Sequence, residues 1–461
     1  MKKIIAVTLT ILSLKTMGQV WQPYNANLDT SIQIEHISVV DSNTVWGLGL
    51  PNTSSPYSTS YRKFTRTING STFTSGSFSD STFNPSNISA INDSTAYIAC
   101  WSRNGQNGQI LKTNNGGITW ANIASSNMFT GATNFPDAVH FYDAMNGWAL
   151  GDTNNTNGWG NEFEIWRTSD GGITWIRVPA ANIPNPLSSE YGGTDVYATV
   201  STNHIWFGTS KGRIYYSADK GNTWNVSVVT GMYNERINGV AFRDTINGIA
   251  WGQTAGGTRL LCKTNNGGAS WTSVTVNTSN VGTEAFCAIP GKGYLSTGLN
   301  MTNAAMVTSV TYDDGNTWSV LQSIPNNNSN LSISDIIVSV QMIDSLHGWG
   351  GSFSNNTLPN GLYGMNKYIG VNLSAITSIK EPDNFQMYPN PTKDVLNIEN
   401  LPTNEKGIIQ INDMLGNEVK RVLCKTSSVT IGVSDLNDGV YNVNYLSNKE
   451  NIMNKQIIIV K

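Results

Sequence analysis

Residues 168–175 read TSDGGITW, and the recurrence of this stretch decides the fold. Two glycines beside an aspartate predict a tight turn, because glycine accepts a positive φ and aspartate bonds the backbone two residues further on. The tryptophan then begins a strand. A carboxylate in so polar a segment could also serve in catalysis or bind a cation. The choice between a turn and an active site depends on the rest of the chain.

The pattern Ser/Thr-x-Asp/Asn-x-Gly-x-Ser/Thr-Trp, here called the box, occurs five times, at 113–120, 168–175, 217–224, 264–271 and 311–318. The third residues are Asn115, Asp170, Asp219, Asn266 and Asp313, and the tryptophans are Trp120, Trp175, Trp224, Trp271 and Trp318. Successive tryptophans lie 47 to 55 residues apart, a period typical of four-stranded propeller blades. A reaction needs one nucleophile rather than five. We therefore expect the third residue to hold a hairpin turn and the tryptophan to pack between blades.

A second motif alternates with the boxes: an apolar strand, a polar turn, then an aromatic or apolar strand that ends in a small residue. Its seven copies begin near residues 37, 88, 138, 196, 240, 286 and 338, and each predicts a hairpin. The expected fold is all-β, a seven-bladed β-propeller. The first blade keeps only a degenerate box at 67–73, and the seventh has none. Because residues 21–24 resemble the strand after each box, they could supply the missing outer strand of blade seven and close the ring.

Composition excludes several classes of protein. The chain has 461 residues, of which 13% are charged, and a formal net charge of −3, which argues against an electrostatic nucleic-acid partner. The four cysteines are scattered and lack zinc-site spacing, although Cys262 and Cys287 could meet across adjacent blades. We expect no metal and no cofactor.

The two ends of the chain differ from the repeats. Lys2 and Lys3 precede an apolar run and then small residues, so residues 1–18 are expected to be an export signal, and no other stretch approaches the length of a membrane helix. The propeller is expected over 19–370 and a linker over 371–384. Residues 385–461 contain short alternating strands and turn residues, which predicts a small C-terminal β-sandwich.

The tail resembles the type A C-terminal sorting domain of the Bacteroidetes type IX secretion system. The resemblance depends on Tyr388-Pro-Asn-Pro391, Gly416 in DMLGNEV, LNDGVYNV at 436–443 and the lysine-bounded KQIIIVK at 455–461. It implies Sec export, passage across the outer membrane, removal of the tail, and release or attachment to surface lipopolysaccharide. The type IX machinery is thus an expected partner.

The repeats resemble the BNR/Asp-box families over about residues 21–370. The combination of NGWALG at 146–151 with TSDGGITW is most similar to seven-bladed propellers related to the photosystem II assembly factor, and to sortilin-type proteins. This resemblance implies a fold rather than a function, because one fold hosts many activities.

We expect a ligand site on the face of the propeller opposite the boxes. Each box is expected in the turn between the third and fourth strands, so the loops from strand two to three and from strand four to the next blade open on the opposite face, here called the loop face. Long loops occur there at 49–63, 151–164, 179–195, 230–238 and 351–364. Aromatic, amide and charged side chains suit a carbohydrate or peptide surface, although they could equally be ordinary solvated loop residues. The candidate binding residues are Tyr57, Tyr61, Trp159, Glu162, Glu190, Tyr191, Tyr233, Glu235 and Arg236.

Three functions are compatible with this pattern, and no catalytic residue is identifiable. A secreted or surface propeller that binds carbohydrate or protein comes first, a carbohydrate-active hydrolase second, and a structural surface protein third. A xyloglucanase-like hydrolase needs two carboxylates roughly 5 to 10 Å apart, for which Glu162, Glu190, Asp195 and Glu235 are available. A sialidase is less favoured, because the chain lacks the early Arg-Ile-Pro motif and its arginines do not fall at matching blade positions.

Overall fold

The computed structural model describes residues 20–28, 32–51, 62–78, 82–130, 135–152, 162–254, 257–302, 304–325, 336–354, 364–370, 373, 386–401, 407–413, 418–447 and 450–461. The chain divides into two compact units, residues 1–371 and 372–461. Strands dominate both, and the first also holds a short 3-10 helix, η1 (Ala180–Asn182). Over the described residues, no helix is long and apolar enough to cross a membrane.

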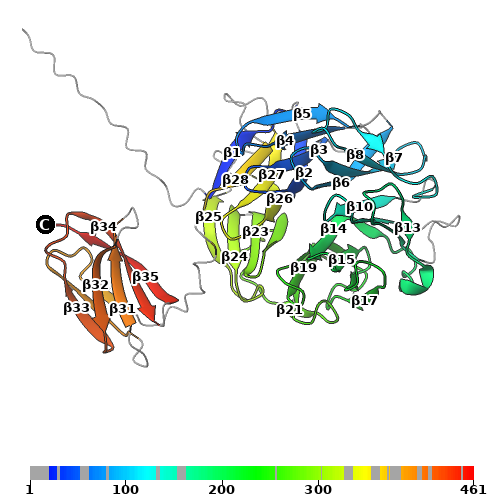
Figure 1. Ribbon diagram of the computed structural model, residues 1–461. Helices are drawn as coiled ribbons and strands as arrows, with labels where there is room; N and C mark the ends of the chain where they lie inside the picture. Colours follow the sequence, from blue (N-terminus) through cyan, green and yellow to red (C-terminus); the bar gives the residue numbers. More distant parts are fainter. Residues whose placement is uncertain are drawn as a thin grey trace, which may run out of the picture. The chain divides into compact units, whose positions relative to one another are not determined.

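The first unit consists of seven antiparallel blades around a central axis (Figure 1). Blade 1 contains β2 (Ile32–Val39), β3 (Val45–Pro51), β4 (Lys63–Thr67) and β5 (Phe73–Ser77). Blade 2 contains β6 (Phe83–Ala90), β7 (Ala96–Ser102), β8 (Gln109–Thr113) and β9 (Ala121–Asn122). Blade 3 contains β10 (Pro136–Phe141), β11 (Gly147–Gly151), β12 (Glu164–Thr168) and β13 (Ile176–Arg177). Blade 4 contains β14 (Gly192–Val200), β15 (His204–Thr209), β16 (Arg213–Ser217) and β17 (Asn225–Val228). Blade 5 contains β18 (Arg236–Phe242), β19 (Gly248–Gln253), β20 (Arg259–Thr264) and β21 (Thr272–Val274). Blade 6 contains β22 (Ala285–Ile289), β23 (Gly293–Leu299), β24 (Ala305–Thr311) and β25 (Ser319–Pro325). Blade 7 contains β26 (Ile337–Met342), β27 (Gly348–Ser354), β28 (Gly364–Tyr368) and β1 (Trp21–Asn25). The first strands of neighbouring blades contact one another around the ring. This architecture confirms the predicted all-β, seven-bladed propeller.

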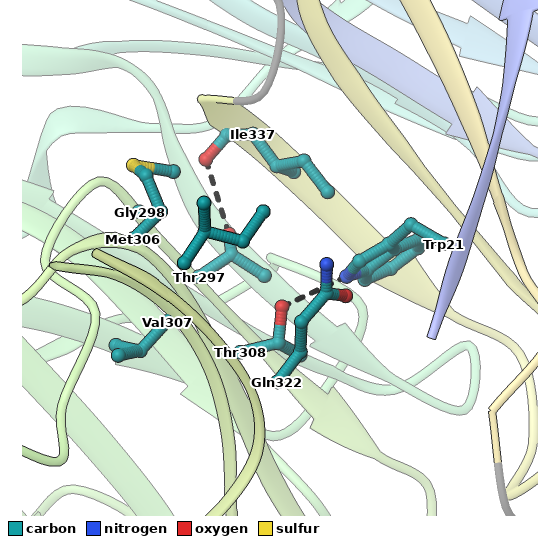
Figure 2. Close-up of a pocket in the computed structure, with 9 residues that line it drawn as sticks. Trp21, Thr297, Gly298, Met306, Val307, Thr308, Gln322 and Ile337 are labelled. Carbon is teal, nitrogen blue, oxygen red and sulfur yellow. Dashed lines mark hydrogen bonds between the residues drawn. The ribbon is translucent and has the colours of Figure 1, made fainter. Parts of the chain in front are cut away.

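The N-terminal strand closes the ring. β1 pairs antiparallel with β28, with Trp21 opposite Tyr368, and the blue β1 lies beside the yellow β28 in Figure 1. The Trp21 Nε1–H donates to Thr308 Oγ1 of blade 6 at 2.9 Å, and the Val20 N–H donates to Gln322 Oε1 at 3.1 Å. Figure 2 shows Trp21 beside these two partners, around a crevice of about 20 Å³ that has room for about one water. The predicted closure is confirmed.

Each box holds its own turn. Thr168 Oγ1 donates to Asp170 Oδ1 at 2.8 Å, and the same carboxylate oxygen accepts the Thr174 N–H at 2.9 Å. The bonds from Thr174 do most to lower the pKa of Asp170, to about 2. Asn115 makes the equivalent bond, because its Oδ1 accepts the Thr119 N–H at 3.0 Å. An uncharged amide therefore does the same work as a carboxylate.

The box turns share one face with the turns between the first and second strands. The Gly171 N–H donates to Met145 O at 2.8 Å, and the Gly116 N–H donates to Ser94 O at 2.9 Å. Each bond joins the two turns of one blade. The connections from strand two to three and from strand four to the next blade therefore end on the opposite side, the loop face.

The box tryptophans lie between blades. Trp175 of blade 3 is 7% exposed and donates its Nε1–H to Ile123 O of blade 2 at 3.0 Å. The Trp271 Nε1–H of blade 5 donates to Ser227 Oγ of blade 4 at 3.1 Å. The other three box tryptophans also pack in cores that include side chains of the preceding blade. These contacts place an indole at five of the seven blade interfaces.

The four cysteines, Cys100, Cys262, Cys287 and Cys424, are buried free thiols. The disulfide considered for Cys262 and Cys287 is therefore not formed.

The second unit is a small sandwich of two sheets. One contains β29 (Gln386–Tyr388), β30 (Val395–Glu399) and β33 (Ser428–Gly432); the other contains β31 (Gly407–Asn412), β32 (Glu418–Cys424), β34 (Gly439–Ser447) and β35 (Glu450–Ile459). Leu396 and Ile398 of the first sheet share a core with Ile409, Val443 and Ile457 of the second. Alternating apolar residues on both sheets produce this common core.

Candidate functional site

The predicted loop-face residues differ in burial and in hydrogen bonding. Tyr57, Tyr61 and Trp159 lie outside the described residues. Glu162 Oε1 accepts a hydrogen bond from Arg177 Nη2 at 2.9 Å, and its side chain is 20% exposed. This ion pair lies at the outer strand of blade 3, away from the central axis.

Glu190 is buried within blade 4. Its side chain is fully covered, and its carboxylate pairs with Arg213, whose Nε lies 3.0 Å from Oε1. Thr209 Oγ1 donates to the same carboxylate at 2.5 Å, and the Leu187 N–H donates to it at 2.7 Å. Its oxygens are therefore bonded inside the protein, and Glu190 anchors the 179–195 loop.

Tyr191 and Tyr233 lie near each other at the turn between β15 and β16. The Tyr191 N–H donates to Ser210 Oγ at 3.0 Å, and the Asn234 N–H donates to Lys211 O at 3.3 Å. Both rings reach solvent, with exposed fractions of 37% for Tyr191 and 61% for Tyr233. Glu235, half-buried, precedes Arg236, which is exposed at the start of β18.

β-Bulges occur near the loop-face end of the inner ring. The pairing between the first two strands shifts register at this place in every blade except blade 6. A bulge re-aims a side chain that would otherwise follow the strand alternation. The extra residues include Glu35, Ser86, Asp137 and Asn238. Four blades thus direct polar groups to this end of the ring.

A cavity of about 310 Å³ opens between blades 5 and 6, with blade 4 at its inner side. Its apolar wall contains Trp251 and Phe286, whose ring centroids are 4.6 Å apart, and Met301. Trp251 is half-buried and therefore keeps part of its surface accessible. The polar lining comes from Thr194, Arg236, Asn238, Gln253, Arg259, Thr283 and Glu284. Apolar walls with a few polar groups are typical of ligand sites.

Three polar residues of this cavity form a row across blade 5. Arg236 on β18 lies opposite Gln253 on β19, which lies opposite Arg259 on β20. Directly opposed residues of antiparallel strands project to the same face of the sheet. Arg259 Nη2 lies 3.9 Å from Glu284 Oε1 of the blade 5–6 connection. The row presents two guanidinium groups that flank an amide.

Two carboxyl groups of blade 3 lie beside the ring opening. Asp137 and Asp152 share a hydrogen bond, and the Gly192 N–H donates to Asp152 Oδ1 at 2.7 Å. Burial raises the pKa of Asp137 well above its usual range, Asp152 raises it further, and the Arg236 charge opposes the rise. Burial also raises the pKa of Asp152, to about 7. The pair retains a proton near neutral pH.

An ion pair crosses the central channel. His36 Nδ1 of blade 1 lies 2.8 Å from Asp195 Oδ2 of blade 4. Burial works against the charged form of His36, but the Asp195 carboxylate outweighs it and raises the pKa of His36. The channel is thus bridged by side chains. A ligand site is better sought at the loop-face rim than inside the channel.

The other features are weaker candidates. A cavity of about 300 Å³ at blade 2 is lined by Phe83, amides and small residues, with no charged side chain among its lining residues. In the part of the chain that the structure describes, no group of three or more His, Cys, Asp or Glu residues could hold a metal ion. The blade 5–6 cavity is therefore our candidate site.

Sequence reasoning named Arg236 but missed most of this cavity. Trp251, Arg259 and Phe286 lie in strands or at strand ends, whereas the predicted binding residues come from the long loops. Alignment of the seven hairpin motifs could have pointed to them, because it predicts which strands of a blade are neighbours. The ends of β18, β19 and β20 lie together in blade 5.

Comparisons with known proteins identify the tail and the fold. Residues 386–460 match the family described as a secretion system C-terminal sorting domain. A search of curated proteins finds no match to the chain.

One solved structure supports the propeller architecture, and two others are similar at lower scores. YCF48 bound to a D1 peptide is similar at 14% identity and a TM-score of 0.50, over 76% of this chain and 95% of that one. YCF48 from Cyanidioschyzon merolae has 15% identity and a TM-score of 0.49, over 76% and 98%. The GH74 enzyme of Niastella koreensis has 14% identity and a TM-score of 0.40, over 93% and 66%. The first likeness supports the fold alone, and the other two scores are too low to support a conclusion.

The assignment of the tail determines where the protein acts. A sorting domain of this family directs its carrier to the type IX machinery, with which it interacts. The second unit is thus a secretion system C-terminal sorting domain, and the protein is exported through the type IX system to the cell surface or the extracellular space.

Proposed function

We propose that the protein is a non-catalytic extracellular binding module whose propeller holds a carbohydrate or protein ligand. The observation that supports this most is the blade 5–6 cavity. It combines the accessible Trp251 ring with the Arg236–Gln253–Arg259 row and lies beside the loop face. An aromatic wall with convergent polar groups is suited to recognition.

The carboxylates favour binding over hydrolysis. A glycosidase needs two carboxyl groups roughly 5 to 10 Å apart with room for the sugar between them. Asp137 and Asp152 share a hydrogen bond, so no substrate fits between them. Glu190 is bonded to Arg213, and Glu284 is the single carboxylate of the cavity lining.

A peptide ligand remains within the proposal. A propeller with a TM-score of 0.50 to this chain was solved with a peptide bound, so this type of fold can present a peptide site. The exposed Tyr191 and Tyr233, next to the blade 4 turn, would be candidates for such a contact.

The test is a glycan and peptide array probed with the full chain, next to a hydrolysis screen on the same ligands. We expect binding without turnover, and loss of binding in Trp251→Ala. Trp101→Ala is the matched control, because Trp101 is a half-buried tryptophan of blade 2 outside the cavity. Turnover that disappears in Glu284→Gln would overturn the proposal and favour a hydrolase. A ligand that binds Trp251→Ala as tightly as the parent protein would exclude this cavity as its site.

We also propose the processing that this route requires. Residues 1–18, which lie outside the described residues, would be the export signal, and residues 385–461 would be removed at the surface. Mass spectrometry of the mature protein should find an N-terminus at residue 19 and a C-terminus before residue 385. A mature protein that retains either segment would contradict this.

A further inference from the structure

The row across blade 5 has the spacing to hold an extended anionic ligand. Adjacent strands are about 4.8 Å apart, so Arg236 and Arg259, two strands apart, are separated at their Cα atoms by roughly 10 Å. This separation is about the length of a disaccharide. Gln253 lies between them, and its Nε2–H donates to Gly257 O at 3.0 Å. That bond uses the amide nitrogen, so the amide oxygen can accept a hydrogen bond from a ligand hydroxyl.

The positive charge of the row is only partly compensated. Glu284 faces Arg259 across 3.9 Å, and the two side chains are 35% and 29% exposed, so this contact is loose and solvated. The charge of Arg236 acts on Asp137, and burial raises the pKa of Asp137, which works against a compensating negative charge there. Among the described residues, the Arg236 guanidinium donates no hydrogen bond to a protein acceptor. Its guanidinium is therefore available to a ligand carboxylate.

The apolar wall next to the row is suited to a sugar ring. Trp251 lies two residues before Gln253 on β19, so its side chain projects from the same face one pleat deeper. It packs against Phe286, which holds the indole in place. A fixed and partly accessible indole stacks on the C–H face of a sugar, while the amides and hydroxyls of Asn238, Gln253 and Thr283 suit sugar hydroxyls.

We propose that the blade 5–6 cavity binds an acidic saccharide, with a sugar carboxylate held by Arg236 and Arg259 and a sugar ring stacked on Trp251. This rests on the proposed binding function and specifies its ligand. Guanidinium groups bind carboxylates through charge-assisted, often bidentate hydrogen bonds. The compact volume of about 310 Å³ favours one or two sugar units over an extended peptide.

The experiment is calorimetric titration of the full chain with oligosaccharides of galacturonate, mannuronate, guluronate and glucuronate and with sialyllactose. Each is paired with its carboxyl-reduced counterpart. We expect one or more acids to bind and their reduced forms to bind at least tenfold more weakly. Binding should also weaken as salt rises, because the contacts are partly exposed charges.

Variants assign the effect to the row. Arg236→Gln and Arg259→Gln should each weaken binding about tenfold or more, because each removes a charged donor. Arg177→Gln, the same change at an exposed arginine of blade 3, should leave affinity unchanged. Tryptophan fluorescence during unfolding checks that each variant keeps the propeller folded.

The outcomes separate this inference from the proposed function. Equal binding of acids and reduced forms, or full affinity in both arginine variants, would overturn the acidic ligand while the binding function stands. No binding to any acid at millimolar concentration would also overturn it. A peptide or neutral glycan on the array would then still support a binding module.

Discussion

The strongest test of the fold is substitution of Trp21, which holds the closing strand β1 against blade 6. This side chain is 5% exposed, packs edge-on against Tyr368 at a centroid distance of 5.4 Å, and donates to Thr308 Oγ1 at 2.9 Å. Truncation of a buried tryptophan to alanine costs about 3–5 kcal/mol. Trp21→Ala should therefore lower the free energy of unfolding by that amount. Trp21→Phe keeps much of the ring contact and loses the hydrogen bond, so we expect about 1–2 kcal/mol.

The assay is denaturant unfolding of the full chain followed by tryptophan fluorescence. All 14 tryptophans lie between positions 21 and 349, so the signal reports the propeller and not the tail. Deletion of residues 20–25 should have a larger effect, because it exposes the edge of β28 and promotes association between molecules, detectable by light scattering. An unchanged unfolding midpoint in Trp21→Ala would refute the idea that β1 stabilises the closed ring.

Three further predictions follow from the contacts described above. Asp170→Ala should lower the unfolding midpoint, whereas Asp170→Asn should not, because Asn115 makes the same bonds. Since the pKa of Asp170 is lowered, its contribution is present above about pH 4 and is lost as pH falls towards 2. Asp219 and Asp313 have lowered pKa values too, so circular dichroism during acid titration should detect a loss in both proteins, and a smaller one in Asp170→Asn than in the parent protein. The pKa of Asp137 is raised, so its effect has the opposite sign, and stability should fall as pH rises from about 4 through neutrality. Asp137→Asn should reduce that dependence in thermal unfolding and leave the part that belongs to Asp152, whose pKa is also raised by burial, and an unchanged pH profile would contradict this. Deletion of residues 385–461 should leave a folded propeller in the cell envelope, as measured by fractionation, and normal surface delivery would contradict the role of the tail.

The fold was predictable because its signals are local and repeated. The box depends on a bond from Thr168 to Asp170, two residues away, so the sequence pattern and the turn geometry carry the same information. Repetition at a constant period then converts one turn into a blade count. The closing strand was also predictable, since residues 21–24 resemble the strand that follows each box, and the pairing of β1 with β28 confirms it.

The candidate site was not predictable in the same way, because it depends on register. Arg236 and Gln253 face each other only because a bulge at Asn238 shifts the pairing by one residue. Counting back from the turn without that bulge would place Arg236 opposite Thr254 and on the other side of the sheet. Glu190 was named as a loop-face candidate from its position in a long loop, whereas its carboxylate is buried in an ion pair with the Arg213 guanidinium.

The bulges also explain how a repeated fold can carry a unique site. The boxes must keep their sequence, because each one holds a turn and an interface. The bulged residue bonds to no opposite partner in the ladder, so its side chain can vary between blades without disturbing the hairpin. Glu35, Ser86, Asp137 and Asn238 occupy this position in four blades. Different residues at the bulges and at the strand ends beside them therefore give one sector of a near-symmetric ring side chains that the other sectors lack. The two arginines of blade 5 lie in that sector.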